Sequence, residues 1–517
     1  GDRMRPIALF LLSALSFLPA PAHAEWLQAS SAHFVIYADD SERNLRRFAD
    51  QLERYHSAMS LLTGRKSGPP PSPSNRVTVY VVDDGQQVRA LHGGKSPNVG
   101  GFYIPRAGGS LAVVPRVRTG SRNTTWSMIV LLHEYAHHFA ISANSMSLPR
   151  WFSEGGAEFF ASSSFEPDGS MWVGRPAEHR AGELFYARDV KVADLLDPTE
   201  YLKRKNRNND AFYGKSWALY HYLTFDKGRA GQLSNYLVEL NAGKDQRTAA
   251  LDAFGSFEQL ERDVDGYVAR STITALKIPA SMLSPASIEI TRLSAGAAAI
   301  MPAQISSRRG VDAETAQTVA TEARAVAARF PSDPAVLTAL AEAEYDAGND
   351  QPAITAANAA LKLDPSQTNA YIQKGYALFR LAETADDKAA AYRRARAPFV
   401  ALNRREPDHP IPLLYFYRSY VEPGLAPPPL AVDGLRRAAA VAPFDQDLRM
   451  MLCTTLIRLG LQDEARSVLQ SIANDPHRGG LSEAASRMIA RLDSQPKWTG
   501  DGIDAMMPSG ASTDEGE

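Results

Sequence analysis

Residues 133–137 read HEYAH, and residues 149–158 read PRWFSEGGAE. The first stretch lies inside residues 126–141, where apolar side chains follow a helical period and are dense enough to require burial on most sides. Residues four apart lie on one face of a helix, so His133 and His137 can present two imidazoles to one tetrahedral metal ion, with Glu134 beside them. The two stretches therefore predict a pair of helices that bind a metal.

A catalytic zinc ion needs a third protein ligand and an open fourth position, and Glu154 in the second stretch is the candidate. Together the stretches resemble the gluzincin peptidases, the clan of thermolysin and aminopeptidase N, whose third ligand is a glutamate on the helix after HExxH. In the aminopeptidase N branch this glutamate stands in a segment similar to WLNEGFA, and WFSEGGA at residues 151–157 aligns Glu154 with it. The resemblance implies Zn2+ as the cofactor.

The resemblance also implies an activity and roles for two residues. Peptide bonds would be hydrolysed by a zinc-activated water, with Glu134 as the general base. Relatives of aminopeptidase N carry a tyrosine that stabilises the transition state in a YxKG segment, and Tyr213 takes that position in YGKS at residues 213–216, where serine replaces the glycine. The alternative for Tyr213 is an aromatic packing residue at the start of a helix.

Glu158 lies one helical turn beyond Glu154 and so shares its face. Metal-binding histidines usually donate their second ring nitrogen to a carboxylate or a carbonyl, which fixes the ring. We expect Glu158 to accept this hydrogen bond from His133, as an acidic residue at the corresponding offset does in thermolysin-like enzymes. The alternative is a solvated surface acid.

Two other ligand sets are disfavoured by the residues after the motif. The metzincin pattern requires glycine at position 140 and histidine at position 143, and both positions are alanine. His138 is rotated by about 100° from His137 around the helix, so it points away from the metal-binding face.

Ahead of these helices the sequence predicts a small sheet with helices. Residues 77–82 read VTVYVV, which indicates a buried strand. Further strands are expected at residues 33–37, 101–104 and 111–114, and further helices at 41–62, 213–224, 230–240 and 257–276. Residues 25–280 are therefore predicted to form an α+β catalytic domain of the gluzincin type, with a helical zinc-binding lobe after the sheet.

Proline and serine in residues 281–310 predict a linker, and the alanine-rich segment at 311–495 predicts an all-α solenoid of tetratricopeptide-like repeats. About four repeats are expected between Pro334 and His477, at a spacing close to 34 residues, with one lengthened near residues 384–391. Gly375 follows Tyr371 in the large-then-small pair that lets the two helices of a repeat approach each other. The alternative is an irregular helical bundle.

The two ends of the sequence are expected to lie outside the folded domains. Met4 and Arg5 precede an apolar run at residues 7–18 and the segment Ala-His-Ala at 22–24, which predicts a signal peptide over residues 1–24 and a periplasmic or secreted protein. That run is too short to span a bilayer, so no stable membrane span is expected after cleavage. Residues 496–517 are predicted to be a disordered tail because they contain little to bury.

The composition narrows the class of partner. The formal net charge of −2 at pH 7 in 517 residues gives no overall field for nucleic acid. Cys453 is the single cysteine, so the chain has no internal disulfide. The expected substrate is a peptide or protein, and the repeats offer a surface for a possible protein partner.

The type of peptidase follows from a departure from the family pattern. Aminopeptidase N-type exopeptidases carry a GxMEN strand whose glutamate holds the substrate amino terminus, and residues 98–103 here read NVGGFY, without an acid. We therefore expect an endopeptidase, whose substrate could pair with this strand by β-addition. Two alternatives stay open, which are a catalytically idle zinc-binding scaffold for protein partners and a zinc amidase that acts on a non-protein amide.

Overall fold

The computed structural model describes residues 25–65, 69–94, 99–117, 124–143, 148–186, 189–202, 211–475 and 479–508. The predicted signal peptide lies outside the described residues, as does the end of the predicted tail. None of the helices within these ranges is both long enough and apolar enough to cross a membrane.

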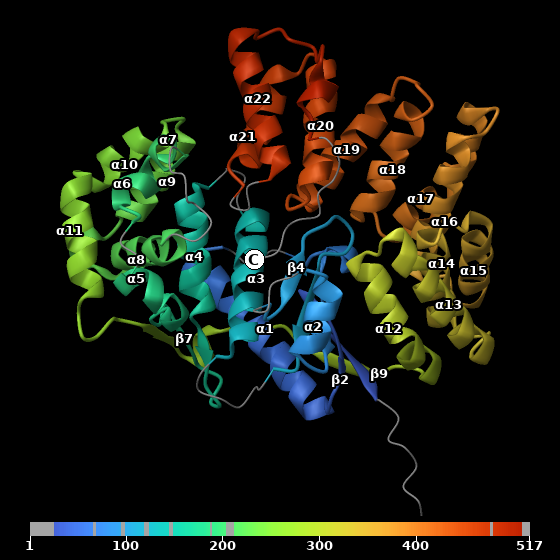
Figure 1. Cartoon of the computed structure of the whole chain (residues 1–517), viewed down its shortest axis with the longest axis horizontal. Coiled ribbons are helices and arrows are strands. Elements are labelled where there is room, and N and C mark those ends of the chain that lie inside the picture. The colour runs from blue at the N-terminus through green and yellow to red at the C-terminus, as the bar shows by residue number, and fades with distance from the viewer. Residues whose placement is uncertain are drawn as a thin grey trace, which may run out of the picture.

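A six-stranded sheet forms the base of the N-terminal lobe (Figure 1), in the strand order β4-β5-β3-β2-β1-β9. The strands are β1 (Trp26–Ser30), β2 (Phe34–Asp39), β3 (Val77–Val82), β4 (Phe102–Ile104), β5 (Leu111–Pro115) and β9 (Glu289–Arg292). The neighbouring strands β2, β3 and β5 run parallel, whereas β4 pairs antiparallel with β5, β1 with β2, and β9 with β1. β4 is therefore an edge strand.

Helices cover both faces of this sheet. On one face α1 (Glu42–Leu62) crosses over between β2 and β3 and buries Leu52 against Val79. On the other face α2 (Gly85–His92) and α12 (Ala295–Arg309) bury Val88 and Met301 against Val82. Parallel strands are connected by such crossover helices, and a sheet covered on both faces is apolar throughout its centre, as VTVYVV shows for β3.

The prediction of a linker over residues 281–310 is wrong. β9 pairs with β1, with Arg292 opposite Leu27, and α12 buries Met301 and Ile305 beneath the sheet. The strand is only four residues long and largely exposed, so its sequence carries no alternation that would distinguish it from a loop. Pairing with a strand that lies far away in the sequence creates it, and the lobe extends to the end of α12.

The second half of the lobe is helical. Its helices are α3 (Trp126–Ala143), α4 (Arg150–Ala161), α5 (Ala181–Tyr186), α6 (Val192–Leu196), α7 (Pro198–Leu202), α8 (Phe212–Phe225), α9 (Gln232–Asn241), α10 (Gln246–Phe254) and α11 (Phe257–Val268). A small sheet of β6 (Ser164–Phe165), β7 (Met171–Val173) and β8 (Leu276–Ile278) lies beside them. The helix expected to continue to residue 276 ends at Val268, and Leu276 instead begins β8.

Helix α4 packs against both α3 and α8, and one glycine permits the close approach to α8. A Cβ atom at Gly155 would overlap the backbone carbonyl of Ser216 on α8. Gly155 directly follows Glu154, so this close contact between helices lies beside the Glu154 position.

We expect Gly155→Ala to lower the free energy of unfolding by about 1–3 kcal/mol, because the added methyl group must push two helix backbones apart. Urea unfolding followed by circular dichroism measures the change. Gly266→Ala is the matched control, since nothing lies within 4 Å of its Cβ position in the interior of α11. This control should leave stability unchanged or raise it by up to about 1 kcal/mol. Equal effects of the two substitutions would contradict the packing argument.

The prediction of helical repeats is confirmed for the C-terminal half. Four antiparallel pairs follow one another, namely α14 (Pro334–Asp346) with α15 (Asp350–Leu363), α16 (Thr368–Glu383) with α17 (Lys388–Arg405), α18 (Pro410–Val421) with α19 (Pro429–Val441), and α20 (Gln446–Arg458) with α21 (Gln462–Ala473). α13 (Ala313–Arg329) precedes them and α22 (Gly480–Ser494) follows. Gly375 is the close-contact position within its pair, because a Cβ there would overlap the ring of Phe399.

The repeats form an arc that begins beside the sheet and ends above α3 (Figure 1). The turn between α19 and α20 reaches the lobe, where the amide of Ala107 donates to Asp445 Oδ2 at 2.8 Å and the ring of Phe444 lies 4.5 Å from that of His138. The side chain and the amide of Ser74 both donate to Glu406. The repeat array is thus packed against the helix that carries HEYAH.

The predicted disordered tail is wrong for residues 496–508. Trp498 and Ile503 are 5% and 2% exposed, and residues Ile503–Met506 form a short 3-10 helix. These two side chains join the apolar core of the last repeats. Two apolar side chains are enough to order this segment because the neighbouring helices already provide an apolar surface for them. The composition of the segment alone does not reveal that surface.

Candidate metal centre

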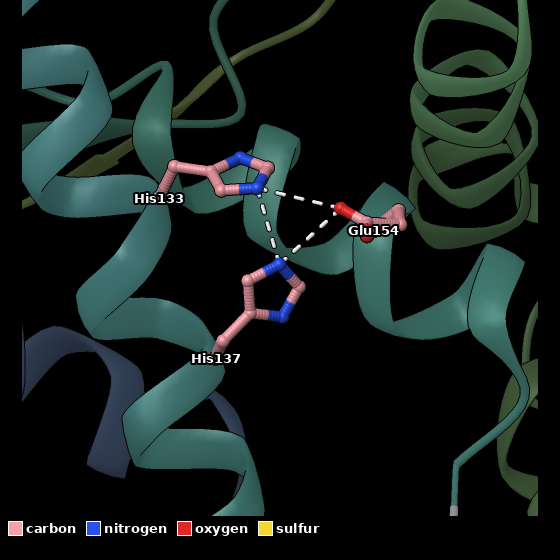
Figure 2. Close-up of side chains that lie close together, drawn as sticks. All are labelled: His133, His137 and Glu154. Carbon is pink, nitrogen blue, oxygen red and sulfur yellow. Dashed lines mark hydrogen bonds and ion pairs between the residues drawn. The ribbon is translucent and has the colours of Figure 1, made fainter. Parts of the chain in front are cut away.

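Three side chains from two helices converge on one point (Figure 2). The Nε2 atoms of His133 and His137, one turn apart on α3, lie 3.1 Å from each other. Glu154 Oε2, from α4, lies 3.3 Å from the first nitrogen and 3.2 Å from the second. Each residue thus offers one ligand atom to a common centre, and all three side chains are buried.

This donor set fits a catalytic zinc ion. Two imidazole nitrogens and one carboxylate oxygen are a common set of protein ligands for such an ion, which keeps its fourth position open. Glu154 is 0% exposed, and a carboxylate at that depth is costly unless positive charge faces it. A divalent cation held by these three atoms would supply that charge.

Each histidine has a second partner behind the centre. Nδ1 of His137 lies 3.1 Å from Ser153 Oγ, and Nδ1 of His133 lies 3.4 Å from Glu158 Oε1. Glu158 is 1% exposed, so it is not a solvated surface acid. With the outer nitrogen engaged, each ring directs Nε2 towards the common centre.

Two residues outside the motifs, His179 and Arg180, hold Glu158 from the other side. His179 Nε2 lies 2.6 Å from Glu158 Oε2, and Arg180 donates from Nη2 and Nε to Oε1 at 2.7 and 2.9 Å. Burial acts to raise the pKa of Glu158, but hydrogen bonds and positive charge from His133, His179 and Arg180 outweigh it and hold the pKa well below its usual range. Glu158 is therefore an ionised acceptor for His133.

No sequence signal marks His179 and Arg180. They precede α5 in a short 3-10 turn, and their distance along the chain from Glu158 follows no helical or strand period. Only the path of the chain around β6 and β7 brings them back to α4.

We expect Glu158→Ala to weaken zinc binding by about 10- to 100-fold, because it removes the acceptor that orients His133. Competition with a fluorescent zinc chelator measures the dissociation constant. Glu178→Ala is the matched control, since Glu178 is exposed one residue before His179. A zinc affinity of Glu158→Ala equal to that of this control would contradict the assigned contact.

The charge around His133 predicts a pH dependence of metal binding. Burial lowers the pKa of His133, but the Glu154 and Glu158 carboxylates outweigh it and raise the pKa to about 10. Below that pH a metal ion must displace the proton on Nε2, so zinc affinity should rise with pH by up to about tenfold per unit. Titration calorimetry at pH 6, 7 and 8, in buffers of different ionisation enthalpy, measures the affinity and the released protons. Equal affinity at pH 6 and 8 would contradict the raised pKa.

The structure also places the remaining predicted residues near the centre. Tyr213 lies in the first turn of α8, and its ring centroid is 6.4 Å from that of His133. Glu134 follows His133 on α3 and is half-buried. His138, one helical turn after Glu134, contacts the hydroxyl of Tyr103 on β4, so Glu134 lies on the side of α3 that faces the edge strand.

His138 has no part in the three-ligand group. Its Nδ1 lies 2.6 Å from the hydroxyl of Tyr103, and its ring stacks on that of Tyr135 at 5.8 Å. This agrees with its expected direction away from the metal face. The contact instead joins α3 to β4.

Fold and site together define a protein with an α+β lobe, a candidate metal centre and an attached array of helical repeats. The profile of a family described as "Protein of unknown function (DUF1570)" matches residues 128–242, which include all six predicted site residues. A comparison with curated proteins gave no match.

Two solved structures are similar in part. One is a thermophilic TPR protein from Thermus thermophilus, with 19% identity and a TM-score of 0.30, over 34% of this chain and 91% of that one. The other is a fragment of MamA from Desulfovibrio magneticus, with 17% identity and a TM-score of 0.27, over 39% of this chain and 98% of that one. Both TM-scores are low.

Proposed function

We propose that this chain is a zinc-dependent peptidase, and more specifically an endopeptidase. The observation that carries the proposal is the buried convergence of His133, His137 and Glu154 with the half-buried acid Glu134 next to it. A purely structural zinc site has no use for an adjacent general base and usually has four protein ligands. Three protein ligands would leave the fourth position of a zinc ion to water and substrate.

The residues around the centre would divide the reaction between them. Zinc held by the three ligands would act as a Lewis acid that makes water a nucleophile near neutral pH. Glu134 would take the proton of the attacking water and pass it to the leaving amine. Tyr213 would donate its hydroxyl to the oxyanion of the substrate carbonyl.

The edge strand β4 supports a peptide as the substrate. It is the last strand of the sheet, contacts α3 directly and lies on the side of α3 that carries Glu134 and His138. An extended peptide could add to such an edge through main-chain hydrogen bonds, which would lay a scissile bond across the centre. No acid lies in residues 99–103 to hold a substrate amino terminus, and this favours cleavage within a chain.

Two measurements on one preparation of the full-length protein test the proposal. Zinc stoichiometry is measured first, and then cleavage of an unfolded protein is followed before and after chelation and again after zinc is restored. We expect one zinc per chain, activity that the chelator removes and zinc restores, and internal fragments by mass spectrometry. Release of single terminal residues would overturn the endopeptidase assignment.

Two further outcomes point to the alternatives. Bound zinc without cleavage of any protein would favour either the idle scaffold or an amidase for a non-protein amide, and absence of zinc would end the proposal. A periplasmic or secreted location and a protein partner on the repeats remain predictions. Fractionation of cells and co-purification with the full chain test them.

A further inference from the structure

Arg180 lies between the candidate metal centre and Tyr213. Its guanidinium donates two hydrogen bonds to Glu158 Oε1, and Glu158 faces Nδ1 of His133. The same guanidinium carbon lies 4.7 Å from the centroid of the Tyr213 ring. One side chain therefore contacts both the residue that orients a metal ligand and the expected oxyanion donor.

A second route joins Arg180 to the start of α8. Nη1 of Arg180 donates to Glu183 Oε1 at 2.8 Å, and Glu183 Oε2 accepts from the backbone amide of Gly214 at 2.7 Å. Gly214 follows Tyr213, and a Cβ at this glycine would come within 2.9 Å of Glu183 Cβ. The first turn of α8 is thus tied to the guanidinium through one carboxylate.

The planar shape of a guanidinium matters at this position. Arg180 uses three of its nitrogens on two carboxylates while its face lies over an aromatic ring, an arrangement that the compact ammonium of lysine cannot reproduce. The side chain is 22% exposed, so a small cation from solvent can reach the space that it occupies.

We propose that Arg180 is a positioning residue that holds His133, through Glu158, and Tyr213, through ring contact and Glu183, in one fixed arrangement. This inference rests on the proposed peptidase function. Loss of the guanidinium should let Glu158 turn from His133 and should let Tyr213 move relative to the centre. Both zinc affinity and the rate with saturating zinc should then fall.

Three full-length variants test this proposal: Arg180→Ala, Arg180→Lys and Arg262→Ala. The last is the control, because it removes an arginine from the surface of α11. We expect Arg180→Ala to bind zinc about 10- to 100-fold more weakly, and to show at least about tenfold lower kcat with saturating zinc and a KM within about twofold. Guanidinium chloride at low, non-denaturing concentration should restore part of both losses, whereas sodium chloride at the same ionic strength should not. Arg180→Lys should keep its fold, shown by circular dichroism, and still lose kcat.

The opposite results would overturn the proposal. These are a zinc affinity and kcat of Arg180→Ala within twofold of the control, equal rescue by both salts, or wild-type kcat in Arg180→Lys. Wild-type protein that binds zinc but cleaves nothing would defeat the peptidase function alone, because zinc affinity and its rescue by guanidinium would still decide the role of Arg180. Wild-type protein without zinc would overturn both.

Discussion

Glu134→Gln is expected to lower the cleavage rate of an unfolded protein by about 10²- to 10⁴-fold while the chain keeps one zinc ion. Glutamine has the size of glutamate but cannot accept the proton of the attacking water. Zinc content should not change, because the candidate ligand group consists of His133, His137 and Glu154 without Glu134. Initial rates with saturating zinc and elemental analysis of the same sample measure the two quantities.

The control for this substitution is Glu178→Gln, which makes the same chemical change at an exposed position near the site. It should cleave at the wild-type rate. If Glu134→Gln keeps more than a tenth of the activity, the general base lies elsewhere. If it loses zinc together with activity, Glu134 belongs to the ligands rather than to the catalytic step.

Glu154→Ala is expected to weaken zinc binding by more than about 100-fold, because it removes a ligand and not only the partner of a ligand. Activity should disappear at micromolar zinc. A metal that binds only the folded state also stabilises it, so zinc should raise the melting temperature of the wild type and not that of this variant. Thermal unfolding with and without zinc, beside chelator competition, measures both effects.

Ser153→Ala is the graded comparison for Glu154→Ala. Ser153 contacts the outer nitrogen of His137 and is not itself a ligand, so its loss should cost about tenfold in zinc affinity. A zinc affinity of Glu154→Ala within tenfold of the wild type would show that a different residue completes the site. A loss in Glu154→Ala no larger than that in Ser153→Ala would contradict the assignment of Glu154 as a ligand.

The grouping of His133, His137 and Glu154 could be predicted in part because the helix period fixes the geometry of the two histidines. His133 and His137 share a face whenever residues 126–141 are helical, and the segment WFSEGGA marks Glu154 through its resemblance to known peptidases. The same period placed His138 off that face and Glu158 on the face of Glu154. The helix period and the single segment WFSEGGA were enough to predict these positions.

The supporting contacts could not be predicted in this way. His179 and Arg180 reach Glu158 only because the chain returns to α4 after β6 and β7. Phe444 reaches His138 from the repeats, more than 300 residues further along the chain. Side chains that meet across such separations leave no period in the sequence, since neither partner constrains the residues beside the other.

The same contrast holds for the boundaries of the domains: some follow from the sequence, and others only from the tertiary structure. The period of apolar residues by itself determined the valine-rich strand β3, the helix of HEYAH and the recurring helix pairs after Pro334. Only the tertiary structure decided that residues 289–309 complete the first lobe and that Trp498 belongs to the core of the last repeats. A short strand or a single large side chain gains its stability from a surface supplied by distant residues, and that surface exists only once the chain has folded.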